Sequence, residues 1–298
     1  MVYWRKVGFP KMRFKYLDDM KMYNVHDIIE LTETAFEKAL AESAFSQLRY
    51  DSNKLRLNNF AYSIRELSRY ILYRLAPDEL VKDTCWFKPN DKKNPDAITR
   101  SQRMKYAIQQ GLSDDFLFAA LGLDFNDKIK ALKSSIDTLS EYTHVNEETF
   151  DCPESKVNKI SSDVIKTFID FAKGIKECRI GIVDSLEDSI NEELVNKLFG
   201  EVLNDIDWLA THHEIDDYSI NSMKLRDFSH DYCEFEVDGD VTARLQYGSD
   251  GDMKRGDGYE TWESFPFTAR LYTTLEKGEI QYNLKISDFS VNTDGHWG

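Results

Sequence analysis

CEFEVDGDVTARLQYG, residues 233–248, decides the fold class because its apolar and polar residues alternate. A period of two is typical of a β-strand with one buried face. Asp238–Gly239 in its middle is a dipeptide common in tight turns, so we predict a hairpin there. FTARLYTTLEKGEIQYNLKISDFSV, residues 267–291, alternates in the same way around Lys277–Gly278. The sequence therefore predicts four to six antiparallel strands after about Asp217.

Upstream of these strands, apolar residues recur every three or four positions, which is the helical period. Thr99 is a suitable N-cap and Gly111 a suitable stop for one of the helices. The helices that we expect cover about residues 24–48, 55–75, 99–110, 114–121, 124–142, 155–178 and 185–210.

The chain is thus expected to have an α+β fold, with a helical domain followed by a small antiparallel β-rich domain. The boundaries that we predict are a basic, aromatic arm over 1–23, a helical domain over 24–182, an acidic connecting helix over 183–216 and an antiparallel β domain over 217–298.

Charge is distributed unevenly along the 298 residues, whose net charge is -15. From Asp184 to the end there are 26 acidic and 9 basic residues, a net charge of -17, which leaves +2 for residues 1–183. An acidic surface repels phosphate. The chain is therefore a poor candidate for a general DNA-coating protein, and any contact with nucleic acid should involve the first half.

Sequence motifs for cofactors and metals are missing. There is no GxxxxGK[ST] phosphate loop and no HExxH pair. GSDGDMKRGDGYETW, residues 248–262, has aspartates but no glutamate at the twelfth position of a calcium loop, so we interpret it as a loop between strands. We expect no metal site and no cofactor.

The apolar segments and the cysteines of the sequence indicate where the protein is located. No apolar run reaches the roughly 18 residues of a membrane span, and the N-terminus has no apolar signal region. The four cysteines are far apart in sequence, which is typical of reduced thiols. We expect a cytoplasmic protein without membrane contact.

Candidate site residues lie at helix ends and on helix faces of the first half. His144 follows a long predicted helix, where a histidine can act as general acid or base, although the helix dipole also favours one there. Arginine forks suit phosphate recognition, and salt bridges to nearby carboxylates are the alternative. The cations that share helix faces are Arg65 with Arg69, and Arg100 with Arg103, alongside Lys105.

A family resemblance involves the same residues. The strings RELSRYILYRLAP (65–77), CWF (85–87), TRSQRMKYAIQQGLSDDF (99–116) and LSEYTHVNEETF (139–150) resemble the bacterial predicted pPIWI-associating nucleases. The helical part is also similar to HEPN domains. LQYGSDGDMKRGDG (245–258) and SFPF (264–267) are similar to the β domain of the same family.

The resemblance implies a HEPN-like, RNase-type effector of a prokaryotic antiviral defence system. In that interpretation His144, Arg69 and Arg103 are catalytic, and Arg65, Arg100 and Lys105 bind RNA without a metal. HEPN nucleases carry an arginine four to six residues before the histidine, and none precedes His144 at that distance. The chain departs from the motif, so whether it is an enzyme stays open.

Three functions therefore remain as hypotheses. The first is the nuclease, with other defence proteins as partners and a homodimer through the helical domain. The second is a non-catalytic sensor or accessory subunit. The third is an antitoxin-like regulator whose acidic half covers a basic partner.

Overall fold

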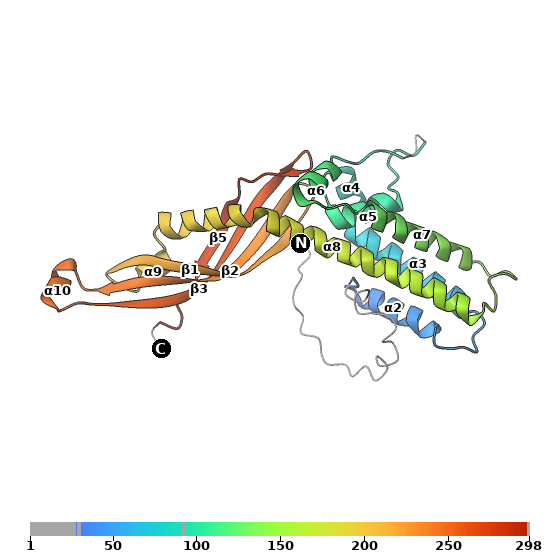
Figure 1. Cartoon of the computed structure of the whole chain (residues 1–298), viewed down its shortest axis with the longest axis horizontal. Coiled ribbons are helices and arrows are strands. Elements are labelled where there is room, and N and C mark those ends of the chain that lie inside the picture. Colours follow the sequence, from blue (N-terminus) through green and yellow to red (C-terminus); the bar gives the residue numbers. More distant parts are fainter. Residues whose placement is uncertain (1–27, 29–30, 91–92, 297–298) are drawn as a thin grey trace. The chain divides into compact units, whose positions relative to one another are not determined.

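The computed structural model describes Ile28, residues 31–90 and residues 93–296, and it has two compact units. The first extends to Cys178 and the second begins at Arg179. The long helix α8, Glu154–Gly200, contributes to both (Figure 1). The arm expected over residues 1–23 lies outside the described residues.

Helices make up the first unit. Thr34 and Thr99 each form a reciprocal capping box with the side chain three residues later, and Ser113 caps the next helix alone, so three helices begin where the local sequence directs. Pro77 follows α3 and ends it, as expected. The bounds are α2 Ala35–Gln47, α3 Arg56–Leu75, α4 Asp78–Lys82, α5 Arg100–Gln109, α6 Asp114–Leu121 and α7 Asn126–Tyr142.

The stop of α5 differs from the expectation. We predicted Gly111 as the helix stop, but Gln110 is the C-cap and takes a φ of 50°. Positive φ is sterically costly for a residue with a Cβ. Tertiary contacts hold this turn, because the carbonyl oxygen of Gln110 accepts a 2.9 Å hydrogen bond from Trp86 Nε1.

Helix α8 replaces two predicted helices. The sequence suggested helices over 155–178 and 185–210, yet one helix of 47 residues runs from Glu154 to Gly200. The glycine at 181 lies inside it without breaking it, because Ile182, Leu186 and Ile190 keep a four-residue period and are fully buried. After Gly200 the chain leaves the helix, and only the short α9, Asn204–Asp207, follows.

The second unit contains an antiparallel five-stranded sheet. Its order is β1–β2–β3–β4, and β5 also pairs with β3. Figure 1 labels β1, β2, β3 and β5. The α+β fold and the number of strands agree with the sequence. The bounds are β1 His212–Phe228, β2 Tyr232–Tyr247, β3 Tyr259–Glu276, β4 Glu279–Ile280 and β5 Lys285–Val291.

The hairpin predicted at Asp238–Gly239 is wrong. Strand β2 passes straight through this dipeptide, pairing Gly239 with Ile220 on one side and Phe267 on the other. A Cβ on Gly239 would lie 2.3 Å from the Ser219 carbonyl oxygen and 2.5 Å from the Phe267 ring. The glycine is needed for close packing within the sheet and not for a turn.

The other predicted turn is confirmed. Lys277 and Gly278 have φ values of 52° and 83° and connect β3 to β4. The predicted loop 248–262 is only partly a loop. It contains the short helix α10, Asp250–Arg255, and β3 begins already at Tyr259.

Strand β1 begins at His212, earlier than the sequence indicated. Its pairing with β2 shifts register at Asp216, Asn221 and Arg226, so each of these is an extra residue. The side chains opposite the buried positions of β2 are therefore spaced alternately two and three apart. They are His213, Ile215, Tyr218, Ile220, Met223, Leu225 and Phe228. This spacing is neither helical nor strictly alternating, which explains the missed strand.

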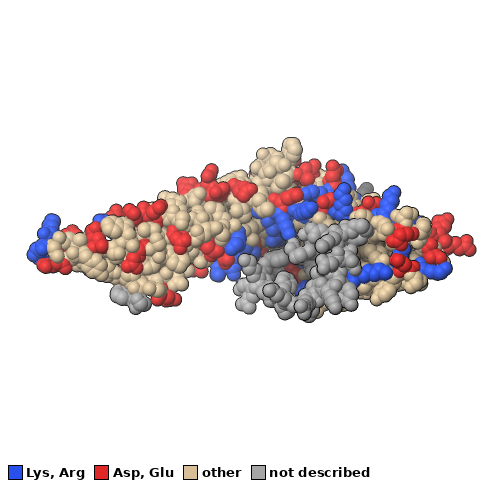
Figure 2. Space-filling view, turned by 60° about the horizontal axis from the view of Figure 1, so that its bottom comes forward, with Lys and Arg blue, Asp and Glu red and all other residues tan. Residues whose placement is uncertain are grey.

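The two units differ in surface charge. In one view, Asp and Glu predominate over the strands, whereas clusters of Lys and Arg also occur over the helical unit (Figure 2).

Within the part of the chain that the structure describes, no helix combines the length and the apolar character needed to cross a membrane.

Candidate functional site

The four arginines singled out by the sequence line one pocket in the helical unit. Its volume is about 240 Å³, and α3, α5 and the segment before α5 form its walls. We call it the arginine pocket. Its lining residues are Arg65, Glu66, Ser68, Arg69, Leu72, Tyr73, Ile98, Arg100 and Arg103.

Arg103 is the most tightly held of the four. Its side chain is only 5% exposed and forms an ion pair with Asp78 at 2.5 Å. Its Nη1 donates to the Ala76 carbonyl oxygen at 2.6 Å, where α3 ends. The guanidinium also lies 3.7 Å from the centre of the Tyr73 ring. These contacts indicate that Arg103 positions the pocket wall.

Arg69 and Arg100 are more exposed, and each pairs with one carboxylate of the described residues. Arg69 pairs with Glu66 at 2.9 Å on the same helix. Arg100 pairs with Asp137 of α7 at 2.7 Å. Hydrogen bonds from Lys133 and then Arg100 hold the pKa of Asp137 below its usual range. Exposed pairs of this kind contribute little and can exchange for a phosphate.

Arg65 has the most hydrogen-bonding capacity left. It is half-buried, and its Nη1 lies 3.4 Å from the Thr143 hydroxyl. No carboxylate among the described residues forms an ion pair with it. With respect to the described residues, most of its five donors are thus available to a ligand in the pocket.

His144 lies beyond the pocket, at the same end of α7 that Arg65 contacts. It directly follows Thr143, is exposed, and its carbonyl oxygen accepts a 3.0 Å hydrogen bond from Thr149. The buried Asn58 of α3 donates to the Tyr142 carbonyl at 2.9 Å. Contacts from α3 therefore position the segment that carries His144, although the imidazole does not line the arginine pocket.

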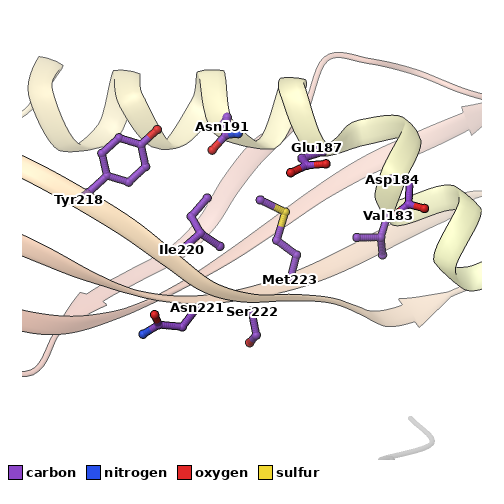
Figure 3. A pocket seen from close by; sticks show the side chains of 9 residues that line it. All are labelled: Val183, Asp184, Glu187, Asn191, Tyr218, Ile220, Asn221, Ser222 and Met223. Carbon is purple, nitrogen blue, oxygen red and sulfur yellow. The ribbon is translucent and has the colours of Figure 1, made fainter.

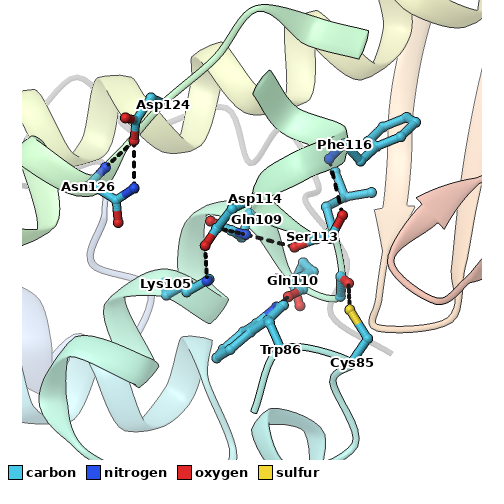
Figure 4. A network of polar contacts seen from close by, with 12 residues as sticks. Cys85, Trp86, Lys105, Gln109, Gln110, Ser113, Asp114, Phe116, Asp124 and Asn126 are labelled. Atoms are coloured by element: carbon cyan, nitrogen blue, oxygen red, sulfur yellow. Dashed lines mark hydrogen bonds and ion pairs between the residues drawn. The ribbon is translucent and has the colours of Figure 1, made fainter. Parts of the chain in front are cut away.

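Lys105 lies apart from the arginines. Its Nζ pairs with Asp114 at 2.7 Å and lies 4.8 Å from the centre of the Trp86 ring (Figure 4). Burial tends to raise the pKa of Asp114, but hydrogen bonds from Lys105 and Gln109 lower it overall. Lys105 is not among the pocket-lining residues, and its contacts hold the turn between α5 and α6.

The charge of the arginine pocket favours anions. Its lining carries four arginines and one glutamate, a net charge of +3. Asp78 and Asp137 reduce this to +1, and Lys133, which pairs with Asp137 at 2.6 Å, raises it again to +2. The pocket is positive within a chain whose net charge is -15.

A larger and different pocket lies in the second unit, between α8 and β1 (Figure 3). Its volume is about 480 Å³. Tyr218, Ile220 and Met223 of β1 point toward α8, and Asp184 and Glu187 of α8 lie on the opposite wall. Two carboxylates without a lining cation disfavour phosphate, so this is not the candidate nucleic-acid site.

Besides the two pockets, the second unit has a polar cluster around His296, a histidine that sequence analysis missed. His296 Nδ1 lies 2.6 Å from Glu263, and its Nε2 lies 3.0 Å from the Tyr247 hydroxyl. Burial, followed by Tyr259 and Glu263, raises the pKa of Tyr247, so its hydroxyl stays protonated. The three residues are too far apart in sequence to form a motif. They attach the segment after β5 to β2 and β3.

Comparison with known families relates both units to one group. Among the described residues, no cluster of His, Cys, Asp and Glu side chains is suited to a metal ion. One family model, described as predicted pPIWI-associating nuclease, matches residues 30–168, and a second with the same description matches residues 175–297. No curated protein and no solved structure matches the chain. Because the two models together cover most of its length, the chain belongs to the family of predicted pPIWI-associating nucleases.

Proposed function

We propose that this chain is a HEPN-like, RNase-type effector of a prokaryotic antiviral defence system, acting in the cytoplasm, and that its arginine pocket holds the scissile phosphate. The observation that carries the proposal is the convergence of four arginines, from two helices, on one pocket of about 240 Å³. Membership of a predicted nuclease family supports a nucleic-acid substrate.

In the proposed reaction, His144 removes the proton of a ribose 2′-hydroxyl and the 2′-oxygen attacks the phosphorus. A bond from phosphorus to the 2′-oxygen forms while the bond to the 5′-oxygen breaks. The imidazolium then returns the proton to the 5′-oxygen. Arg65 and Arg69 stabilise the negative charge that develops on the phosphoryl oxygens. The products are a 2′,3′-cyclic phosphate and a 5′-hydroxyl.

Cleavage of end-labelled RNA, with DNA of the same sequence beside it, tests this mechanism. RNA should be cut in the presence of a chelator, and His144→Ala should reduce the rate about a hundredfold or more. The melting temperature of the His144→Ala chain should barely change, because a histidine at a helix end contributes at most about 1 kcal/mol to stability through the helix dipole. His212→Ala, an exposed histidine of the other unit, is the matched control. Cleavage of DNA only with a divalent metal would contradict the mechanism.

A non-catalytic sensor or accessory subunit is the second candidate function. The position of His144 favours it, since the imidazole is exposed and does not line the arginine pocket. In that case the chain would bind nucleic acid without cutting it. Absence of cleavage by the chain, both alone and with the proteins encoded beside it, would select this function.

The partners are part of the proposal. The family description names association with pPIWI, which supports a protein partner from the same defence system. A homodimer through the helical unit would bring two copies of His144 and the arginine pocket together. Light scattering of the purified chain should then give twice the 34.7 kDa mass of one copy.

A further inference from the structure

The exposed face of α3 carries an unusual set of side chains. Most of the helix is buried, and its outer face consists mainly of aromatic and charged residues. Tyr62 and Tyr73 are 59% and 54% exposed. An exposed tyrosine is ordinary when it occurs singly, but these two bracket the arginines of the pocket.

The helical period places these side chains in a line. Tyr62, Arg69 and Tyr73 fall within about 40° of one another around the α3 axis, and the line extends about 17 Å. Arg65 lies about 60° to one side, toward Thr143. The face therefore presents Tyr62, then Arg65 and Arg69, with Glu66 paired to Arg69 beside them, and then Tyr73.

Tyr73 is held in place from behind. One face of its ring lies against the buried Arg103 guanidinium, at 3.7 Å from the ring centre, while about half of the side chain is exposed. Arg103 is itself fixed by Asp78 and the Ala76 carbonyl. A ring already ordered by a cation loses little conformational entropy when a base stacks on it.

We infer that this face of α3 binds single-stranded nucleic acid, with phosphates on Arg65 and Arg69 and bases stacked on Tyr62 and Tyr73. Successive aromatic and cationic side chains are what a single strand requires, because its bases are unpaired and can stack on protein rings. A duplex keeps its bases stacked inside and would use only the arginines. The inference rests on the proposed function, since it names the substrate class of the same pocket.

Fluorescence anisotropy with a labelled 2′-O-methyl uridine 12-mer tests the inference independently of catalysis. This probe has no free 2′-hydroxyl, so the proposed reaction cannot cut it. The full chain should bind it, and also bind a thymidine 12-mer, at least tenfold more tightly than a 12-base-pair duplex. Tyr73→Ala and Tyr62→Ala should each weaken binding about tenfold.

Three comparisons separate stacking from charge and from folding. Tyr73→Phe keeps the ring and should bind nearly as well as the unmodified chain. Tyr50→Ala is the matched control, because Tyr50 is 61% exposed in the same unit but lies outside α3. Arg65→Ala and Arg69→Ala should each reduce the salt dependence of binding by about 0.7 in the log–log slope, whereas Tyr73→Ala should leave that slope unchanged.

Several results would overturn the inference: duplex binding as tight as single-strand binding, a Tyr73→Ala chain that binds like Tyr50→Ala, or no binding of any probe. Tyr62→Ala and Tyr73→Phe keep the test valid if Tyr73→Ala unfolds. Binding of the single strand without cleavage of ordinary RNA would remove the nuclease mechanism and leave this inference standing.

Discussion

The guanidinium of Arg103 lies 3.7 Å from the centre of the Tyr73 ring and at the same time donates to the last turn of α3 through the Ala76 carbonyl oxygen. Sequence analysis placed Arg103 among the catalytic residues. Its buried position and its three partners favour a role in holding the wall of the arginine pocket instead, and this distinction can be measured.

Arg103→Ala should therefore lower the free energy of unfolding by about 2 kcal/mol, because it removes charge-assisted hydrogen bonds and leaves the Ala76 carbonyl without its donor. Arg103→Lys should recover little of the lost stability, since an ammonium cannot reproduce the forked hydrogen-bond donors of the guanidinium. Urea unfolding followed by circular dichroism measures both. Arg65→Ala is the control and should unfold like the unmodified chain. Equal stability of all the variants would contradict the structural role and favour a catalytic role for Arg103.

Gln110→Gly should stabilise the chain by about 1 kcal/mol. Gln110 has a φ of 50° and a ψ of -123°, which glycine adopts without the steric cost of a Cβ. The hydrogen bond from Trp86 uses the backbone carbonyl and survives the change. Gln109→Gly is the contrasting variant, because it removes side-chain bonds to Leu112 and Asp114 and should destabilise. A lower melting temperature for Gln110→Gly would show that its side chain has a role.

Gly239→Ala should destabilise the second unit by about 3 kcal/mol, the upper range for overpacking. The new methyl group would meet the Ser219 carbonyl oxygen and the Phe267 ring at 2.3 and 2.5 Å, and the paired strands cannot move apart without breaking the sheet. Gly200→Ala, at the end of α8, has no atom within 4 Å of the added carbon and should be close to neutral. Thermal unfolding that distinguished neither variant from the parent would contradict the packing at Gly239.

Asp114 should make stability depend on acidic pH. Its pKa is lowered in the folded chain, so it binds protons more weakly than in the unfolded chain. The contribution of Asp114 to the free energy of unfolding is thus fully present above the pKa of the unfolded chain, about 3.9. It disappears as the pH falls through the lower pKa of the folded chain. The stability difference between the parent and Asp114→Asn should be seen at pH 7 and shrink at acidic pH. Asp115→Asn, which removes the exposed carboxylate next to it, is the matched control.

Local sequence was sufficient where a structural feature involves only neighbouring residues. Thr99 predicted a helix start because a cap accepts a hydrogen bond from a backbone amide three residues away. Lys277–Gly278 predicted its turn for the same reason. The pairing of Arg65 with Arg69 on one helix face likewise follows from the helical period alone.

Features that involve residues far apart in the sequence could be identified only from the tertiary structure. The Asp238–Gly239 hairpin was a misinterpretation, because Gly239 is required by Ser219 and Phe267, which are about 20 to 30 residues away. Strand β1 was missed at its start, since bulges alter the period and arise from pairing with β2.

The candidate site shows the same division. Sequence alone determined that arginines share a face on each of two helices, that the second half is acidic, and that an alternating segment forms the sheet. Only the packing of α3 against α5 decided that both arginine pairs line one pocket, that Arg103 is buried beneath Tyr73, and that Lys105 and His144 lie outside it. The physical reason is that helix faces follow from local periodicity, whereas the choice of neighbouring helix depends on burial of apolar residues along the whole chain.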